Sequence, residues 1–281
     1  MKSSPSILLI YTGGTIGMVM DPNTGKLKPF SLDNLLKTIP ELQKFNFEIH
    51  STSFENPIDS SNVSPDLWVR LCEIILANYN KFDGFVILHG TDTMAYSASA
   101  LSFMLSGLNK PVIFTGSQLP IGMVRTDGKE NLLTALEIAA EIDENGNSRV
   151  PEVGIYFDSF LFRGNRAHKI STQDFDAFSS PNFPPLAKAG VDIVYKDNKI
   201  LSQDQNKFKV YNKVEQDILV VTLFPGLSNS MLKNAVDSEN LKGVILRTYG
   251  AGNAPSNSEF LEVIELLFKK GIVVLNVSQC A

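Results

Sequence analysis

Threonine, aspartate and lysine side chains occur in polar turns of the N-terminal half, and together they suit acyl transfer. A threonine hydroxyl is a weak nucleophile that needs a neighbouring base, and a lysine whose pKa is lowered by burial can serve. Thr15, Thr91 and Lys169 supply such groups. Asp92 begins a predicted helix, whose dipole stabilises a carboxylate that can orient the lysine or bind a substrate amine. The two glycines before Thr15 let backbone N–H groups approach a ligand, as an oxyanion hole requires.

The glycine-rich turns lack the motifs of nucleotide and metal sites. Gly13, Gly14 and Gly17 do not have the G-x-G-x-x-G spacing of a dinucleotide site. The Gly-Lys pair at 128–129 continues with Glu130 and does not complete a P-loop. The three histidines lack metal-ligand spacing, and no G-x-S-x-G elbow occurs. We therefore expect chemistry without a metal or a cofactor.

Apolar runs that alternate with helical segments must position these groups. The runs predicted as buried strands are Ile7–Tyr11, Phe85–Leu88, Val112–Thr115 and Val153–Phe157. The segments predicted as helices are Pro65–Asn78, Thr93–Leu105 and Gly128–Ile142. Ser64 suits the N-cap of the first helix, and His89 ends an apolar run, where a hydrogen-bonded structural role is favoured over a general base. The alternation is typical of a mostly parallel α/β sheet flanked by helices.

A polar turn containing glycine follows each predicted strand. These turns are Thr12–Gly17, Gly90–Thr93, Thr115–Gln118 and Arg163–Lys169. Any one of them is ordinary, because glycine and threonine suit tight turns and helix caps. Ligands of open α/β sheets bind at the carboxyl ends of the strands. We therefore expect the four turns to share one edge of the sheet and to form a site there.

The alternation stops in a proline-rich stretch at 175–190 and resumes after about residue 211. The later strands are predicted at Ile218–Leu223, Gly243–Arg247 and Ile272–Val277, and the later helices at Asn229–Asp237 and Ser258–Lys270. The sequence thus predicts a larger N-terminal α/β domain at 1–190, a linker region at 191–211 and a smaller C-terminal α/β domain at 212–281. Because no helix follows to cover the last strand, we expect that domain to be incomplete at its C-terminus.

Composition excludes several classes of protein. Apolar residues make up 43% of the 281 residues and charged residues 20%, which suits a sizeable core and not a disordered chain. The net charge of −5, without a basic block, argues against nucleic-acid binding. Two cysteines support neither a disulfide framework nor a zinc site. The first apolar run is too short for a signal peptide, and none is long enough for a membrane span, so a cytoplasmic protein is expected.

Two segments, Thr12–Gly17 (TGGTIG) and His89–Ala95 (HGTDTMA), resemble the two signature motifs of the bacterial-type L-asparaginases. Further matching segments are Asp59–Asn62, Thr115–Gln118, Arg163–Lys169, Asp176–Phe178, Leu246–Pro255 and Asn276–Cys280. The resemblance spans nearly the whole chain and is closest to the cytoplasmic type I branch of that family.

The resemblance implies hydrolysis of L-asparagine to L-aspartate and ammonia through a threonine-linked acyl-enzyme, without a cofactor. Carried over by position, Thr15 is the primary nucleophile, and Thr91 is the second catalytic threonine, with Lys169 as its base. Asp92 orients the lysine and binds the substrate amine. The substrate-binding positions are Ser60, Ser61, Gly90 and Ser117. The sequence leaves open which threonine performs which step.

Two features differ from the family pattern. Many members have a tyrosine in the loop after the first motif, and Leu27 stands near that place here, so a backbone group or water would replace it. Some type I enzymes bind asparagine at a second, activating site. The residues that match this effector site in part are His168, Arg247, Ser278 and Cys280. His168 stands where a threonine is common, and for Arg247 an ion pair that holds the small domain is an equal alternative.

The resemblance also implies a homodimer or homotetramer in which the partner's second domain closes each active site. L-Asparagine is the expected substrate, with no nucleic-acid or membrane partner. Two alternatives stay open. One is the amidase subunit of a tRNA-dependent amidotransferase, which usually carries an extra N-terminal domain. The other is a non-catalytic asparagine-binding regulator, against which the intact catalytic set argues.

Overall fold

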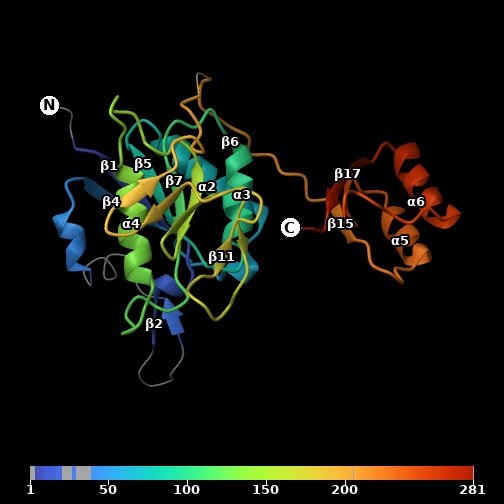
Figure 1. The fold of residues 1–281 in the computed structure, drawn as a ribbon, viewed down its shortest axis with the longest axis horizontal. Helices are drawn as coiled ribbons and strands as arrows, with labels where there is room; N and C mark the ends of the chain where they lie inside the picture. Colours follow the sequence, from blue (N-terminus) through green and yellow to red (C-terminus); the bar gives the residue numbers. More distant parts are fainter. Residues whose placement is uncertain (1–3, 21–26, 30–38, 205, 281) are drawn as a thin grey trace. The chain divides into compact units, whose positions relative to one another are not determined.

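The chain forms two compact units, residues 1–212 and 213–281. The structure is a computed structural model that describes residues 4–20, 27–29, 39–204 and 206–280 (Figure 1). Each unit has its own sheet and its own hydrophobic core.

Within the described residues, the first unit contains an eight-stranded sheet of order β13-β12-β9-β8-β7-β5-β1-β4. The bounds are β1 (Ser6–Tyr11), β4 (Glu48–Ser53), β5 (Gly84–Leu88), β7 (Val112–Thr115), β8 (Val153–Phe157), β9 (Phe160–Arg163), β12 (Ala187–Ala189) and β13 (Ile193–Tyr195). The strands from β4 to β8 pair in parallel, and β9, β12 and β13 pair antiparallel. The predicted mostly parallel sheet is confirmed, and its central strands are apolar throughout because both faces are buried.

Helices cover both faces of this sheet (Figure 1). They are α2 (Pro65–Asn78), α3 (Met94–Met104) and α4 (Gly128–Ala140). Leu132 and Leu136 of α4 pack with Ile7 and Val86 on one face. Ser64 is the N-cap residue of α2, but its side chain makes no capping hydrogen bond. None of the described helices is long and apolar enough to cross a membrane.

Short elements complete the first unit. They are η1 (Thr15–Gly17), β2 (Met18–Met20), β3 (Leu27–Pro29), η2 (Pro40–Lys44), η3 (Ser60–Asn62), β6 (Leu105–Ser106), β10 (His168–Lys169), β11 (Phe178–Ser179) and β14 (Lys209–Val210). The segment predicted as a linker, 191–211, packs within this unit, because β13 pairs with β12 and β14 pairs with β6.

The expectation that the turn Arg163–Lys169 follows β8 at the carboxyl edge is wrong. Asp158 and Ser159, with positive φ values of 43° and 69°, form a tight turn that leads into β9. Because β9 runs antiparallel to β8, Arg163 lies opposite Gly154, near the start of β8. The turn therefore begins at the opposite edge of the sheet, and the chain must cross back before it reaches Lys169.

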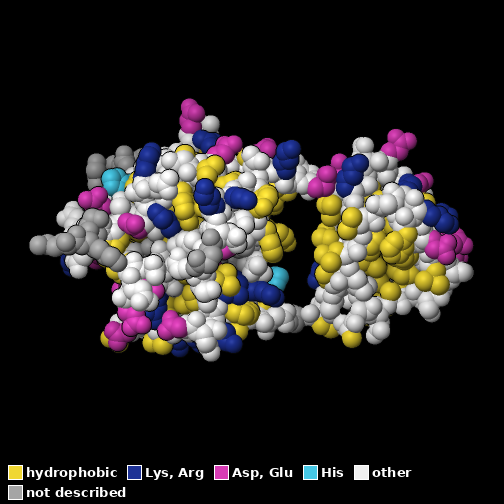
Figure 2. All heavy atoms as spheres, turned by 90° about the horizontal axis from the view of Figure 1, so that it is seen from above, with side chains coloured by type: hydrophobic (Ala, Val, Ile, Leu, Met, Phe, Trp, Pro, Cys, Tyr) yellow, Lys and Arg dark blue, Asp and Glu magenta, His cyan; other side chains and the backbone are white. Residues whose placement is uncertain are grey.

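The second unit is a small parallel sheet with helices on one face. Its elements are β15 (Ile218–Thr222), α5 (Asn229–Val236), β16 (Gly243–Thr248), α6 (Ser258–Lys269) and β17 (Val273–Ser278). Val244 and Leu246 of the sheet pack with Phe260 and Val263 of α6. The alternate side chains of the outer strands stay exposed, and Figure 2 shows hydrophobic side chains on the surface of this unit; they include Ile218, Val220, Val273 and Leu275.

Candidate active site

Three loops of the first unit meet at Gly90. A Cβ atom on Gly14 would lie 2.5 Å from the backbone nitrogen of Gly90, and a Cβ on Gly90 would lie 2.5 Å from Ser60 Oγ. Gly14 also has a positive φ of 91°. Only hydrogen fits at these positions, so the Gly14 and Gly90 loops touch backbone to backbone, and the Ser60 side chain packs directly against Gly90. Thr15 and Thr91, which follow the two glycines, are thereby brought onto neighbouring loops.

Lys169 reaches this edge and contacts the second loop. Its Nζ donates hydrogen bonds to Thr91 Oγ1 at 2.8 Å and to Asp92 Oδ1 at 2.7 Å. The lysine side chain is only 15% exposed, whereas Asp92 is 59% exposed. Asp92 lies just before Thr93, the N-cap of α3, and therefore outside the helix. The distance between the amine and the Thr91 hydroxyl satisfies the geometric requirement for a general base.

The lysine distinguishes the two threonines, which the sequence left equivalent. Thr15 opens η1 and is half-buried, and its hydroxyl forms no hydrogen bond with a described residue. Lys169 contacts Thr91 and not Thr15. The side chain of Leu27, at the place where the family pattern has a tyrosine, lies outside the described side chains. The Lys169 amine therefore lies within hydrogen-bond distance of the hydroxyl of Thr91.

Gln118 also contacts this group, although the sequence did not predict it as a site residue. Its Oε1 lies 3.5 Å from Thr91 Oγ1, and its Nε2 donates to the Asp174 carbonyl at 3.0 Å. The Asp127 carboxylate holds the loop by accepting hydrogen bonds from the amides of Gln118 and Leu119, the former at 2.9 Å. Its place in the sequence could have indicated a role in the site, because Gln118 ends the third predicted polar turn.

The predicted substrate-binding serines differ in exposure. Ser60 is buried against Gly90, and its carbonyl accepts a hydrogen bond from Thr93 Oγ1 at 2.7 Å. Ser61 is exposed, and its amide and hydroxyl both donate to Asp59 Oδ1 at 3.0 Å. Ser117 is buried, and its hydroxyl donates to a backbone carbonyl two residues along the chain. Ser60 and Gly90 thus lie together in the structure.

The predicted effector residues are exposed and divided between the two units. Arg247 lies near the carboxyl end of β16, and Ser278 ends β17. Ser278 Oγ donates to the Gly250 carbonyl and accepts a hydrogen bond from the amide of Cys280. His168 lies in the first unit, in β10. Arg247 has no ion pair with any residue that the structure describes, so the alternative structural role is not seen there.

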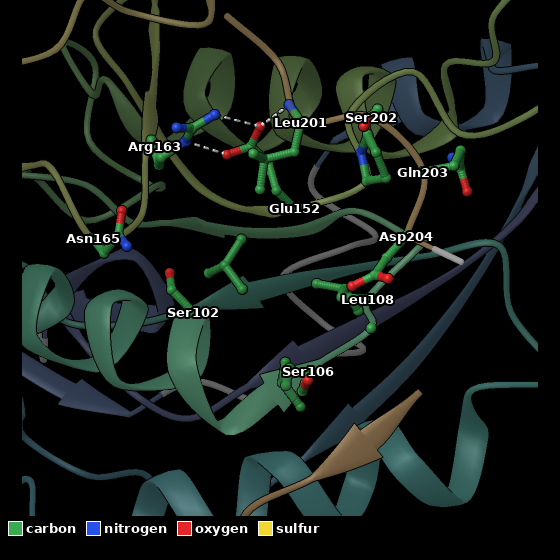
Figure 3. Close-up of a pocket in the computed structure, with 14 residues that line it drawn as sticks. Ser102, Ser106, Leu108, Glu152, Arg163, Asn165, Leu201, Ser202, Gln203 and Asp204 are labelled. Carbon is green, nitrogen blue, oxygen red and sulfur yellow. Dashed lines mark hydrogen bonds and ion pairs between the residues drawn. The ribbon is translucent and has the colours of Figure 1, made fainter. Parts of the chain in front are cut away.

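A separate cavity of about 530 Å³ lies near the amino ends of β7 and β8 (Figure 3). Arg163 and Glu152 form an ion pair in its wall, at 2.6 Å between Nε and Oε2. The amide of Leu201 donates to the same carboxylate at 2.8 Å, which fastens the segment at 201–204. None of the predicted site residues lines this cavity. In the part of the chain that the structure describes, no cluster of His, Cys, Asp and Glu is arranged to hold a metal ion.

Comparison with known proteins gives matches along most of the chain. The family model "Asparaginase, N-terminal" matches residues 6–201, and "Glutaminase/Asparaginase C-terminal domain" matches residues 217–281. L-asparaginase 1 of Escherichia coli is 44% identical over 278 residues, which cover 98% of this chain and 80% of that protein. The crystal structure of L-asparaginase I from Vibrio cholerae has a TM-score of 0.88 at 41% identity, covering 98% of this chain and 81% of that one. A glutamyl-tRNA(Gln) amidotransferase subunit from Thermococcus kodakarensis is 32% identical, and the match covers 98% of this chain and 62% of that protein.

Proposed function

The chain belongs to the asparaginase family, and from this premise we propose that it hydrolyses L-asparagine to L-aspartate and ammonia. The observation that carries the proposal is the hydrogen-bonded group in which the Lys169 amine contacts both Thr91 and Asp92. A hydroxyl with a lysine base and a carboxylate that orients the base is a group suited to acyl transfer.

In the proposed mechanism Thr15 Oγ attacks the side-chain amide carbon of asparagine. The hydroxyl proton of Thr15 passes to the amide nitrogen, the C–N bond breaks, ammonia leaves, and an ester joins the acyl group to the threonine. Water then attacks this ester and releases aspartate. Lys169 accepts the proton of the Thr91 hydroxyl, and Thr91 takes a proton from the attacking water. Asp92 orients the resulting ammonium, and the proton returns through Thr91 to the Thr15 oxygen as the ester bond breaks.

The substrate is bound, in this proposal, by the loops that meet at Gly90. Ser60 and Ser61 hold the α-carboxylate and the α-amine, and Asp92 shares the amine. Ser117 contacts the side-chain amide through its backbone. The contact between Gly90 and Ser60, and the loop that Asp127 holds, support this arrangement.

The test is ammonia release from L-asparagine by the purified full-length protein. We expect turnover in the wild type and a loss of at least about 100-fold in kcat for Thr15→Ala and for Lys169→Met, because each removes a reacting or proton-accepting group. Lys188→Met is the matched control, since Lys188 is exposed and its amine lies over the Phe160 ring. Asparagine that stays intact with well-folded protein would refute the function.

The same assay separates the alternatives. An amidotransferase component would need its partner, whereas an asparaginase acts alone on the free amino acid. A regulator would bind asparagine in calorimetry without releasing ammonia. The greater similarity to L-asparaginase 1, at 44% identity against 32% for the amidotransferase relative, favours the amidohydrolase.

Assembly, location and regulation are further parts of the proposal. We infer a cytoplasmic homodimer or homotetramer, which sedimentation can measure, because the type I enzymes that the sequence resembles assemble in this way. We also infer an effector role for His168, Arg247, Ser278 and Cys280. If asparagine activates the enzyme through them, the rate rises sigmoidally with its concentration, and Arg247→Ala makes the curve hyperbolic.

A further inference from the structure

A chain of three hydrogen bonds ends at the loop that carries Thr91. Trp68 Nε1 of α2 donates to Ser97 Oγ of α3 at 3.0 Å. Ser97 Oγ lies 2.9 Å from His89 Nε2, and His89 Nδ1 lies 2.7 Å from the Gly90 carbonyl oxygen. Two helices are thereby connected through His89 to the peptide group directly before Thr91.

The partners leave one protonation state for the ring of His89. The Gly90 carbonyl can only accept, so Nδ1 carries the proton, and Nε2 accepts the hydrogen bond of the Ser97 hydroxyl. Ser97 in turn accepts from the indole of Trp68, which can only donate. His89 is 1% exposed, and burial lowers its pKa to about 4, so the ring is neutral near pH 7.

The Gly90 carbonyl and the Thr91 amide belong to one planar peptide unit. No described peptide bond is cis, so the N–H of Thr91 points away from the carbonyl that His89 holds. This N–H donates to no residue that the structure describes. Because Gly90 is packed tightly against Gly14 and Ser60, rotation of this peptide would move Thr91 relative to its neighbours.

We propose that His89 is a positioning residue, which with Ser97 and Trp68 fixes the rotation of the Gly90–Thr91 peptide. The direction of the Thr91 amide and the place of its hydroxyl beside Lys169 follow from that rotation. The inference rests on the proposed function, because it concerns the same site. His89 itself touches neither the reacting hydroxyl nor the lysine amine.

Kinetics of the full-length protein test the proposal with Ser97→Ala and Trp68→Phe, which interrupt the chain away from the site. We expect kcat for asparagine to fall by about tenfold or more, with KM within about twofold, because displacement of a catalytic group costs turnover before binding. Ser102→Ala is the matched control, since it removes from the same helix a hydroxyl that donates to the Ala98 carbonyl. Its kcat should equal that of the wild type.

Nitrogen NMR of the histidine rings tests the protonation state of His89 on which the hydrogen-bond chain depends. We expect the His89 signals, assigned by their loss in His89→Gln, to show a proton on Nδ1 and no titration between about pH 6 and 9. Ser97→Ala should alter these shifts. A proton on Nε2, or a titrating ring, would overturn the proposal, as would wild-type kcat in Ser97→Ala.

The two failures are distinguishable. A wild type that releases no ammonia refutes the proposed function whatever the ring state is. An active wild type whose Ser97→Ala variant loses thermal stability but keeps kcat refutes the positioning role and leaves the function standing.

Discussion

Gly14 and Gly90 allow the close approach of the two loops that carry Thr15 and Thr91. At Gly90 a methyl group would lie 2.5 Å from Ser60 Oγ and 2.6 Å from its Cβ. Neither atom belongs to a long side chain that can move aside. Gly90 therefore sets the distance between its own loop and the loop that carries Ser60.

Gly90→Ala should lower kcat/KM for asparagine by at least about 100-fold, because the added methyl separates the loops. It should also lower the free energy of unfolding by about 1–3 kcal/mol, as overpacking does. Steady-state kinetics and urea unfolding measure the two effects. Gly122→Ala is the control, because a Cβ there meets nothing within 4 Å. Equal activity of both variants would contradict this view of the site.

Burial of His89 predicts a pH dependence of stability. Its pKa falls from 6.5 to about 4 on folding, so the unfolded chain binds a proton in this window and the folded chain does not. Stability is therefore lost as the pH drops from about 6.5 to about 4, by about 3 kcal/mol from this residue. Urea unfolding at several pH values should show a smaller loss in His89→Gln than in the wild type. Identical pH profiles would contradict the neutral, buried ring.

At the scale of elements, the hairpin from β8 to β9 is built on an unfavourable turn. Asp158 and Ser159 both have positive φ, which side chains other than glycine adopt at a cost. A hydrogen bond from the Asp158 amide to Asn131 Oδ1, at 3.2 Å, helps to hold the chain in this turn.

Ser159→Gly should therefore raise the free energy of unfolding by about 1 kcal/mol, since glycine adopts this conformation without strain. Thermal and urea unfolding measure the change. Ser53→Gly, in strand β4, is the matched control and should have the opposite sign, because glycine weakens a strand. A loss of stability in Ser159→Gly would mean that contacts of the serine side chain stabilise the fold by more than the positive φ costs.

The elements that the sequence revealed are those with a strong apolar pattern. The four central strands and α2 were predicted almost to the residue, because strands buried on both faces leave continuous apolar runs. β4 was missed since it is an edge strand of largely polar, exposed residues. β9 was missed since Asp158-Ser159 is not a common hairpin signal.

In the candidate site, too, the sequence revealed the features that have a local pattern and not those that lack one. Thr91, Asp92 and Lys169 were suggested by residue type and motif, and the structure places their side chains in contact. A hydrogen-bonded role for His89 beside the turn was predicted and is observed. Gln118 and the partners Ser97 and Trp68 were not predicted, because hydrogen bonds between distant elements leave no local pattern. Their partners are 27 and 29 residues apart in sequence, for Thr91–Gln118 and Trp68–Ser97 respectively.

At the scale of the whole molecule, each unit has a core of its own. Residues 211–217 between the sheets belong to no helix or strand, and Lys213 is exposed. The apolar core of the second unit is formed by its own strands and helices.

Limited digestion with trypsin should therefore cut after Lys213 and yield a fragment that begins at Val214 and resists further cleavage. Mass spectrometry identifies the fragment, and Lys213→Gln should abolish it. Digestion of the second unit as fast as this cut would contradict its independence. The expected order of cleavage follows from the exposed backbone at 211–217.

The backbone contact between Gly14 and Gly90 also bears on protein engineering. The distance between the two loops is set without help from the side chains at Thr15 and Thr91. Exchange of either threonine for serine or cysteine should therefore leave the scaffold unchanged. If the proposed function holds, hydroxyl and thiol groups can thus be compared at the same position without a change in the distance between the loops.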